Sequence, residues 1–265
     1  MQLAKHAGID IPDVEMKSFE GIRAFVIDRF DRKYNPESDT VMRRHVIDGC
    51  QAVDLPPAYK YERQHGDESD GIYIRDGVSF PKLFAIQTIN QDEYRRKLIE
   101  WMTFNIITRN YDAHGKNISF FVRKEGIELA PFYDLVNIEA ILRGAESIKN
   151  GMRDNRENSA PQYFAMSVGE YESATAGNFL PPITAYMLAD FANEFDISLP
   201  RMQMLMTRMI GAVRKSLKIA KEESLKYQLT PAEVDHIDLC IEVVNETIAE
   251  LLEQVSQSQD MDALL

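Results

Sequence analysis

Three polar residues of types that can act in catalysis or bind a metal lie on either side of a short apolar stretch. Asp112 is followed five residues later by Asn117, and Asp134 comes after the stretch. Residues 118–130 predict a β-hairpin, because apolar runs flank a turn that contains Gly126. Asn117 and Asp134 are almost equally far from this turn along the chain. We therefore expect their side chains to meet at the open end of the hairpin.

An amide oxygen and a carboxylate at this point favour a hard cation. With Asp112 on the preceding loop, the set suits Mg²⁺ rather than zinc. The spacing D-x-x-x-x-N, followed by an Asp beyond a hairpin, is that of a phosphotransferase site. There the first Asp accepts the proton of the substrate hydroxyl, and the Asn and the second Asp hold the metal. Each residue alone is better explained as a turn or capping residue, but the combination of all three around a hairpin favours catalysis.

Two further residues of the same segment are candidate catalytic residues. His114 lies two residues after Asp112, although a structural hydrogen bond within the loop is its simpler role. Lys116 either neutralises phosphate charge or is a solvated loop lysine, and the residues leave both open. A metal-dependent hydrolase that uses Asp112, His114 and Asp134 is a weaker alternative, since the other histidines show no HxxxH or HxH spacing.

The surrounding sequence predicts the elements that position this segment. Apolar residues at helical spacing predict a helix over about residues 92–108, with Leu98, Trp101, Met102, Asn105 and Ile106 on one face. The other predicted elements are the end of a helix over 1–8, strands over 14–19 and 22–28, a loop over 31–39, hairpin strands over 118–122 and 127–130, a loop over about 144–160, and helices over about 186–265.

One helix start near the C-terminus is well marked. Residues 230–233, TPAE, combine an N-cap, a Pro at the first helical position and the Glu of a capping box. Apolar residues then recur every three or four positions from Val234 to Val255. This stripe is more typical of a packing face within the chain than of a dimer seam.

Composition excludes several classes of protein. The 265 residues allow one large domain or two modest ones. The 30 Lys and Arg residues against 42 Asp and Glu give a net charge of −12, which disfavours direct binding of nucleic acid. We expect a cytoplasmic protein without membrane contact, because the chain has neither a signal sequence nor an apolar run of transmembrane length. Cys50 and Cys240 show no CxxC spacing, which excludes a zinc ribbon.

The polar segment and several others resemble the HipA family, the serine/threonine kinases that act as toxins in bacterial toxin–antitoxin modules. Residues 109–119, RNYDAHGKNIS, are similar to the family's GNxDxHxKNxS, and residues 129–134, LAPFYD, to its LxPxYD. Supporting similarities are VIDRFDR at 26–32, CQA at 50–52, KYE at 60–62 and FAMSVG at 164–169. The resemblance covers about residues 1–215.

The resemblance implies roles for individual residues, with ATP and Mg²⁺ as cofactors. Asp112 would be the catalytic base, and Asn117 and Asp134 would be Mg²⁺ ligands. Asp28 would meet the adenine through its backbone, and Phe30 would do so through its ring.

The resemblance also implies the fold, an α+β protein-kinase-like architecture. A residual small β lobe and hinge would occupy residues 1–35, an α-helical catalytic lobe 36–255 and a frayed tail 256–265. This chain departs from the family pattern at Arg109, where a Gly is usual, so we expect a differently shaped loop, and at Asp28, where a Glu is usual. The family's glycine-rich phosphate loop and its lysine precede the helix with which this chain begins, so we expect a poor kinase from this chain alone.

The leading hypothesis is a HipA-like serine/threonine protein kinase that transfers the γ-phosphate of ATP to a protein hydroxyl. The resemblance implies a protein substrate, such as an aminoacyl-tRNA synthetase or another translation factor, and a DNA-binding antitoxin as partner. The alternative from another class is a catalytically silent binding module that engages an antitoxin or a complementary kinase half.

Overall fold

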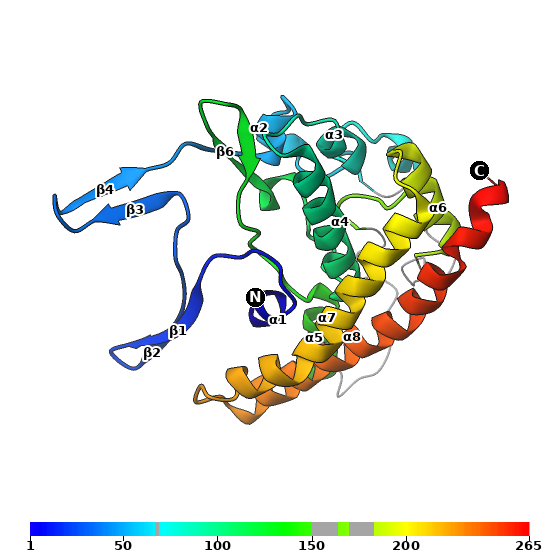
Figure 1. The fold of residues 1–265 in the computed structure, drawn as a ribbon. Coiled ribbons are helices and arrows are strands. Elements are labelled where there is room, and N and C mark those ends of the chain that lie inside the picture. The colour runs from blue at the N-terminus through cyan, green and yellow to red at the C-terminus, as the bar shows by residue number, and fades with distance from the viewer. Residues whose placement is uncertain (67–68, 150–163, 170–182, 265) are drawn as a thin grey trace.

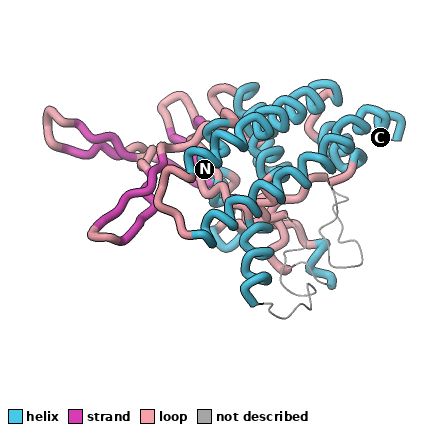
Figure 2. Tube along the Cα trace, turned by 90° about the horizontal axis from the view of Figure 1, so that it is seen from below, coloured by secondary structure: helices cyan, strands magenta, loops and turns pink. Residues whose placement is uncertain are grey.

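Two β-hairpins stand beside a mainly helical body in the computed structural model, which describes residues 1–66, 69–149, 164–169 and 183–264 (Figure 1). Seen from below, both hairpins project from the same side of the helices (Figure 2). The helices are α1 (Gln2–His6), α2 (Gly49–Ala52), α3 (Phe80–Phe84), α4 (Gln91–Ile107), α5 (Ile138–Lys149), α6 (Ala185–Glu194), α7 (Leu199–Ser224) and α8 (Pro231–Gln257). The strands are β1 (Val14–Phe19), β2 (Ile22–Ile27), β3 (Arg32–Asn35), β4 (Thr40–Arg43), β5 (Val46–Asp48), β6 (Ser119–Val122) and β7 (Ile127–Leu129).

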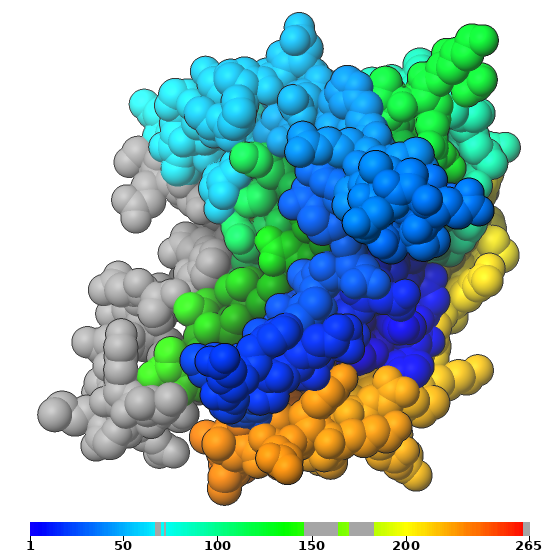
Figure 3. Space-filling model, turned by 90° about the vertical axis from the view of Figure 1, so that its left-hand side faces the viewer, coloured from blue at the N-terminus to red at the C-terminus, as the bar shows by residue number. Residues whose placement is uncertain are grey.

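The first hairpin, β1–β2, is confirmed. Its strands pair antiparallel around a two-residue turn in which Glu20 and Gly21 both have positive φ. That turn matches the natural twist of paired strands. Arg23 connects the hairpin to the turn between α7 and α8 and to the start of α8. Its guanidinium donates to the backbone carbonyl of Gln228 and to the carboxylate of Glu233. In Figure 3 the blue hairpin lies against the orange part of the helices.

The prediction of a loop over residues 31–39 is wrong. Strand β3 occupies its first half and pairs with β4, from Arg32 opposite Arg43 to Asn35 opposite Thr40. The polar composition and Pro36 suggested a loop, but Pro36 lies in the turn and removes no hydrogen bond from the ladder. Exposed two-stranded hairpins accept polar side chains on both faces.

The hairpin predicted after the polar segment is confirmed as β6–β7, with Phe120 opposite Leu129. Strand β5 extends it to three strands by pairing with β6, from Val46 opposite Phe121 to Asp48 opposite Ser119. The sequence did not reveal β5, because a strand of three residues has too little periodicity to detect.

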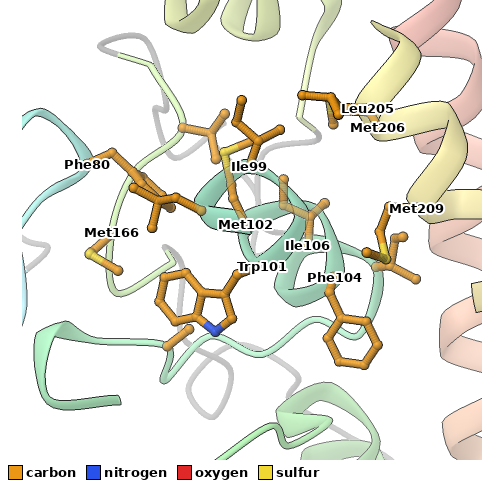
Figure 4. Close-up of a cluster of buried hydrophobic side chains, with 14 of the residues drawn as sticks. Phe80, Ile99, Trp101, Met102, Phe104, Ile106, Met166, Leu205, Met206 and Met209 are labelled. Atoms are coloured by element: carbon orange, nitrogen blue, oxygen red, sulfur yellow. The ribbon is translucent and has the colours of Figure 1, made fainter. Parts of the chain in front are cut away.

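Helix α4 confirms the predicted helix and forms the centre of the core. Every residue from Leu98 to Ile107 is buried, so the helix is enclosed on all sides rather than on the one predicted face. Figure 4 shows its side chains packed between those of α3, α7 and the segment around Met166. The ring of Trp101 stacks on that of Phe132, with centroids 5.4 Å apart. The helix that ends at the polar segment is therefore held firmly in the protein.

Helical structure occupies parts of two regions that were predicted to be irregular. Helix α5 continues to Lys149, where the sequence predicted a loop from about 144; the remainder of that loop lies outside the described residues. Arg143 bonds Glu139 within α5 and Glu246 on α8, which stabilises this helix against its neighbour. At the C-terminus, where a frayed tail was predicted, Ser258–Leu264 forms a 3₁₀ helix whose Ser258 is buried.

Helix α8 begins as predicted. The Thr230 side chain accepts from the Glu233 backbone N–H while the Glu233 carboxylate accepts from Thr230, which completes the capping box. Val244, Ile248 and Val255 of the apolar stripe are buried within this chain, as an intramolecular packing face requires. In the described part of the chain, no helix has both the length and the apolar character needed to cross a bilayer.

Candidate active site

The polar segment begins at the C-terminal end of α4, in a Schellman motif. The Asn110 N–H donates to the carbonyl of Asn105 at 2.9 Å, and the Arg109 N–H donates to that of Ile106 at 3.0 Å. This motif requires a left-handed residue, and Arg109 supplies it with a φ of 46°. Glycine is favoured at such a position because it has no Cβ. Arg109 therefore adopts the backbone conformation that a glycine would take there.

Side chains from α8 hold Arg109 in place. Its Nε donates to the Thr247 hydroxyl at 2.8 Å, and its terminal nitrogen pairs with Glu250 at 3.0 Å. The start of the polar segment is thus bonded to a helix more than a hundred residues later in the chain.

Buried amides connect the end of α4 to Asp134. The Asn110 amide nitrogen donates to Oδ1 of Asn105 at 2.9 Å and to the backbone carbonyl of Asp134 at 3.2 Å. Asn105 donates in turn to the carbonyl of Trp101. Both asparagines are almost fully buried, since Asn105 is 4% exposed and Asn110 is 2% exposed. Buried amides of this kind stay in place because leaving one unpaired is costly.

Asn117 and Asp134 meet at the open end of the β6–β7 hairpin, as their spacing predicted. The Asn117 amide nitrogen donates to Oδ2 of Asp134 at 2.6 Å, and its Oδ1 accepts the His114 N–H at 3.0 Å. Asp134 is exposed and has a φ of 58°, which is strained for a residue with a side chain. Contacts on both its carbonyl and its carboxylate keep it in that conformation.

Asp112 is half-buried and bonds a tyrosine from a distant segment. The Tyr61 hydroxyl donates to its Oδ1 at 2.7 Å. Partial burial, together with this bond and the charge of Asp112, raises the pKa of Tyr61 to about 12. The tyrosine is therefore a neutral hydrogen-bond donor to the carboxylate at physiological pH.

His114 is buried and bonds Lys60. The Lys60 ammonium lies 2.9 Å from Nε2 of His114, and the imidazole packs edge-on against the Tyr61 ring. Burial, reinforced by the Lys60 charge, lowers the pKa of His114. The ring is thus neutral, accepts from Lys60 at Nε2 and carries its proton on Nδ1. This arrangement agrees with the simpler structural role predicted for His114.

The predicted hinge lies against the residue before Asp134. The ring of Phe30 lies 5.9 Å from that of Tyr133, and the Tyr133 hydroxyl donates to the carbonyl of Lys116 at 2.5 Å. Asp28 is exposed, and its N–H is already bonded to the carbonyl of Asp13 at 2.9 Å. Phe30 therefore joins the cluster, whereas Asp28 lies at its margin.

Lys116 differs from the other candidates. It is exposed, and its ammonium forms no hydrogen bond or ion pair with any residue that the structure describes. The sequence analysis missed Lys60, Tyr61 and Tyr133 as members of the cluster. Only the KYE similarity pointed toward the first two, because more than fifty residues separate them from Asp112.

The oxygen atoms present fit Mg²⁺. Asp134 has one carboxylate oxygen that accepts no hydrogen bond from the described residues, and the Asn117 carbonyl oxygen keeps a second lone pair. Mg²⁺ characteristically takes one or two carboxylates and fills its other positions with water and substrate phosphates. Within the described residues no group of three His, Cys, Asp or Glu side chains could hold a metal. The hydrolase alternative therefore has no support from the geometry.

A cavity of about 740 Å³ adjoins this cluster. Its lining is mainly apolar, includes side chains of β1, β2, α7 and α8, and reaches Tyr133 and Asp134. Neither Asp28 nor Phe30 belongs to that lining.

Known proteins are similar to this chain in sequence and in fold. Residues 1–217 match the family described as HipA-like C-terminal domain. The serine/threonine-protein kinase toxin HipA of Shewanella oneidensis is 40% identical over 141 residues, which are 52% of this chain and 33% of that protein. The putative kinase Y4mE of Sinorhizobium fredii is 26% identical over 238 residues, 89% of this chain and 49% of that protein.

A solved structure agrees with these similarities. HipA of Shewanella oneidensis MR-1, in its complex with HipB and operator DNA, matches with a TM-score of 0.82 at 29% identity, over 98% of this chain and 56% of that chain. The predicted α+β kinase-like fold is thereby confirmed. The chain spans only a third to just over half of the length of these proteins.

Proposed function

This chain belongs to the family of HipA-like C-terminal domains, and on that premise we propose that it is the catalytic part of a serine/threonine protein kinase that uses ATP and Mg²⁺. The observation that carries the proposal is the 2.6 Å contact between Asn117 and Asp134, in the same loop system as Asp112. Phosphoryl transfer uses residues that hold the metal together with a carboxylate that can accept the proton of the substrate hydroxyl, and this loop system contains candidates for both.

Each residue then has a defined task. Asp112 accepts the proton of the substrate hydroxyl as that oxygen bonds to the γ-phosphorus and the bond to the departing ADP oxygen breaks. Asn117 and Asp134 would hold Mg²⁺, which when bound neutralises charge on the phosphates. Phe30 and the backbone near Asp28 would contact the adenine. The proposed small lobe and hinge comprise residues 1–35, and the catalytic lobe residues 36–255.

We assign partners on the same basis. The solved relative is a complex of HipA with HipB and operator DNA, which supports a DNA-binding antitoxin as partner. The net charge of −12 favours contact with DNA through a basic partner instead of directly. The substrate would be a protein, with translation factors such as aminoacyl-tRNA synthetases the first to test.

Nucleotide binding is the first test. The melting temperature should rise with ATP only when Mg²⁺ is present, since a ligand at a hundredfold excess over Kd stabilises by about 2.7 kcal/mol. Asp134→Ala should abolish the rise. Asp196→Ala is the matched control, because Asp196 is also exposed with a positive φ of 52° and lies outside the cluster. No rise in the unaltered chain, or a rise that persists in Asp134→Ala, would contradict the proposal.

Phosphoryl transfer is the second test. Radiolabel from [γ-³²P]ATP should appear on serine or threonine of an acceptor protein, and Asp112→Asn should remove it. Transfer at an unchanged rate in that variant would exclude Asp112 as the base.

A second candidate, the silent binding module, is favoured by one observation. Three apolar side chains of the β1–β2 hairpin are more than half exposed, with Phe19 at 57%, Ile22 at 73% and Phe25 at 52%. If binding is the function, Asp112→Asn should bind a HipB-type antitoxin as tightly as the unaltered chain, without Mg²⁺-ATP. Ile22→Ser should weaken that binding. Radiolabel transfer that depends on Asp112 would exclude this candidate.

A further inference from the structure

Lys60 is a partly buried cation without an anionic partner. Its ammonium lies 2.9 Å from Nε2 of His114 and 4.7 Å from the centre of the Tyr61 ring. Among the residues that the structure describes, no carboxylate lies within ion-pairing distance of it. Removing an ammonium from water is costly unless an opposite charge compensates, so a position of this kind suits an anionic ligand.

The backbone around Lys60 is fixed to the catalytic loop. The Lys60 carbonyl accepts the Gly115 N–H at 2.9 Å, three residues from Asp112. Gly115 packs so tightly there that a Cβ would lie 2.5 Å from the Val78 side chain. On the other side, the Glu62 N–H donates to the Ala165 carbonyl at 3.0 Å. Lys60 therefore holds a defined position relative to Asp112 instead of sampling solvent.

Neighbouring contacts indicate what the anion would be. Tyr61, the next residue, donates its hydroxyl to Oδ1 of Asp112, and His114 is two residues beyond Asp112. The ammonium thus contacts the ring of a residue two positions after the carboxylate that would accept the substrate proton, and the residue next to Lys60 bonds that carboxylate. Lys116, the other lysine of the region, is exposed and contacts none of these groups.

We propose that Lys60 is a catalytic residue whose ammonium contacts the phosphoryl group during its transfer from ATP. This role rests on the proposed kinase function. The new bond joins the substrate oxygen to the γ-phosphorus, the bond to the ADP oxygen breaks, and the proton passes to Asp112. Lys60 takes no part in bond exchange. It stabilises the negative charge on the transferring oxygens through donors that are already in place.

Transfer kinetics test the role directly. Lys60→Met should lower kcat about a hundredfold or more, the usual effect of removing one preorganised donor to a transition-state oxygen. ATP affinity should fall while ADP affinity is unchanged, because ADP lacks the transferred group. Lys60→Arg should recover part of the rate, and Lys124→Met, which removes an exposed lysine of the β6–β7 turn, should match the unaltered chain. An unchanged kcat, or an equal loss of ATP and ADP affinity, would overturn the assignment.

Anion binding tests Lys60 even if the chain transfers no phosphate. Millimolar tripolyphosphate should shift the His114 ring signals in NMR spectra of the unaltered chain. Those shifts should be absent in Lys60→Met, provided circular dichroism shows an unchanged fold. Shifts that persist in Lys60→Met, or no shift in the unaltered chain, would overturn the role of Lys60. Absent Mg²⁺-ATP binding with retained tripolyphosphate shifts would instead reject the kinase function while leaving the anion site intact.

Discussion

Substitution of Arg109 should reverse the usual ranking of alanine and glycine. Arg109 has a φ of 46° at the left-handed position of the Schellman motif. Its side chain bonds Thr247 at 2.8 Å and pairs with Glu250, whose side chain is 59% exposed. Both Arg109→Ala and Arg109→Gly lose these bonds, but only glycine relieves the backbone strain. We expect the free energy of unfolding to decrease in the order Arg, Gly, Ala.

The magnitudes follow from these contacts. Loss of the partly buried hydrogen bond to Thr247 should cost about 1 kcal/mol, and the exposed ion pair adds at most about 1 kcal/mol. Arg109→Ala should thus lower the free energy of unfolding by about 1–2 kcal/mol. Glycine adopts the left-handed conformation without strain, which favours Arg109→Gly over Arg109→Ala by about 1–2 kcal/mol. The greater backbone entropy of glycine subtracts about 0.5–1 kcal/mol. The glycine variant should therefore be more stable than the alanine variant by about 0.5–1 kcal/mol.

Urea unfolding followed by tryptophan fluorescence measures these differences, because Trp101 is the single tryptophan and is buried in α4. Arg96 is the control, since it lies within α4 and forms an ion pair with Glu100 at 2.7 Å. There Arg96→Gly should be less stable than Arg96→Ala by about 1 kcal/mol, the opposite order. If glycine is also the less stable substitution at position 109, with equal denaturant slopes, the reasoning about the Schellman motif is refuted.

Three further side chains, Tyr61, Glu233 and Trp101, give testable outcomes. Tyr61→Phe should lower kcat about tenfold, because it removes the hydrogen-bond donor to Asp112. Asp112→Asn should lower the pKa of Tyr61 from about 12 toward 10, as measured by tyrosinate absorbance. A pKa that stays near 12 would show that burial alone raises it. The Thr230 backbone and Arg23 depress the pKa of Glu233 from 4.5 to about 2, so this carboxylate stabilises the fold above about pH 4.5 and loses its effect as the pH falls toward 2. Glu233→Gln should accordingly reduce the urea midpoint at pH 7, with a difference that shrinks below about pH 5; a difference independent of pH would refute this. Trp101→Ala should lower the free energy of unfolding by about 3–5 kcal/mol, because it leaves a cavity where the indole stacks on Phe132. Urea unfolding followed by circular dichroism measures this change. A loss under about 1 kcal/mol would mean that the core collapses around the cavity.

Local sequence signals predicted the elements whose causes are local. The capping box at Thr230 and the apolar spacing of α4 each depend on residues within a few positions, and both elements occur where expected. The β3–β4 hairpin was missed because exposed strands need no alternation of apolar and polar side chains. Helix α5 continues past residue 144, where a loop was predicted, and Arg143 bonds Glu246 on α8, a contact that no local window contains.

The candidate site divides in the same way. Symmetry about a hairpin turn is a local property, so the contact of Asn117 with Asp134 was predictable. Tyr61 reaches Asp112 from 51 positions earlier, and Arg109 reaches Glu250 from 141 positions away. Contacts at such distances depend on how the whole chain folds. Spacing alone predicted that Asn117 and Asp134 meet, while the contacts of Asp112 needed the structure.

Tyr133 connects the proposed hinge to Asp134, the proposed metal ligand. Its ring packs against Phe30, and its hydroxyl bonds both Ser119 and the carbonyl of Lys116. Asp134 follows it directly with a positive φ, a conformation that costs on the order of 1–3 kcal/mol and persists only when neighbours hold it. A displacement of Phe30 would therefore reach the Asp134 carboxylate through a single side chain. Because that path is so short, binding at the hinge and binding at Asp134 should be coupled.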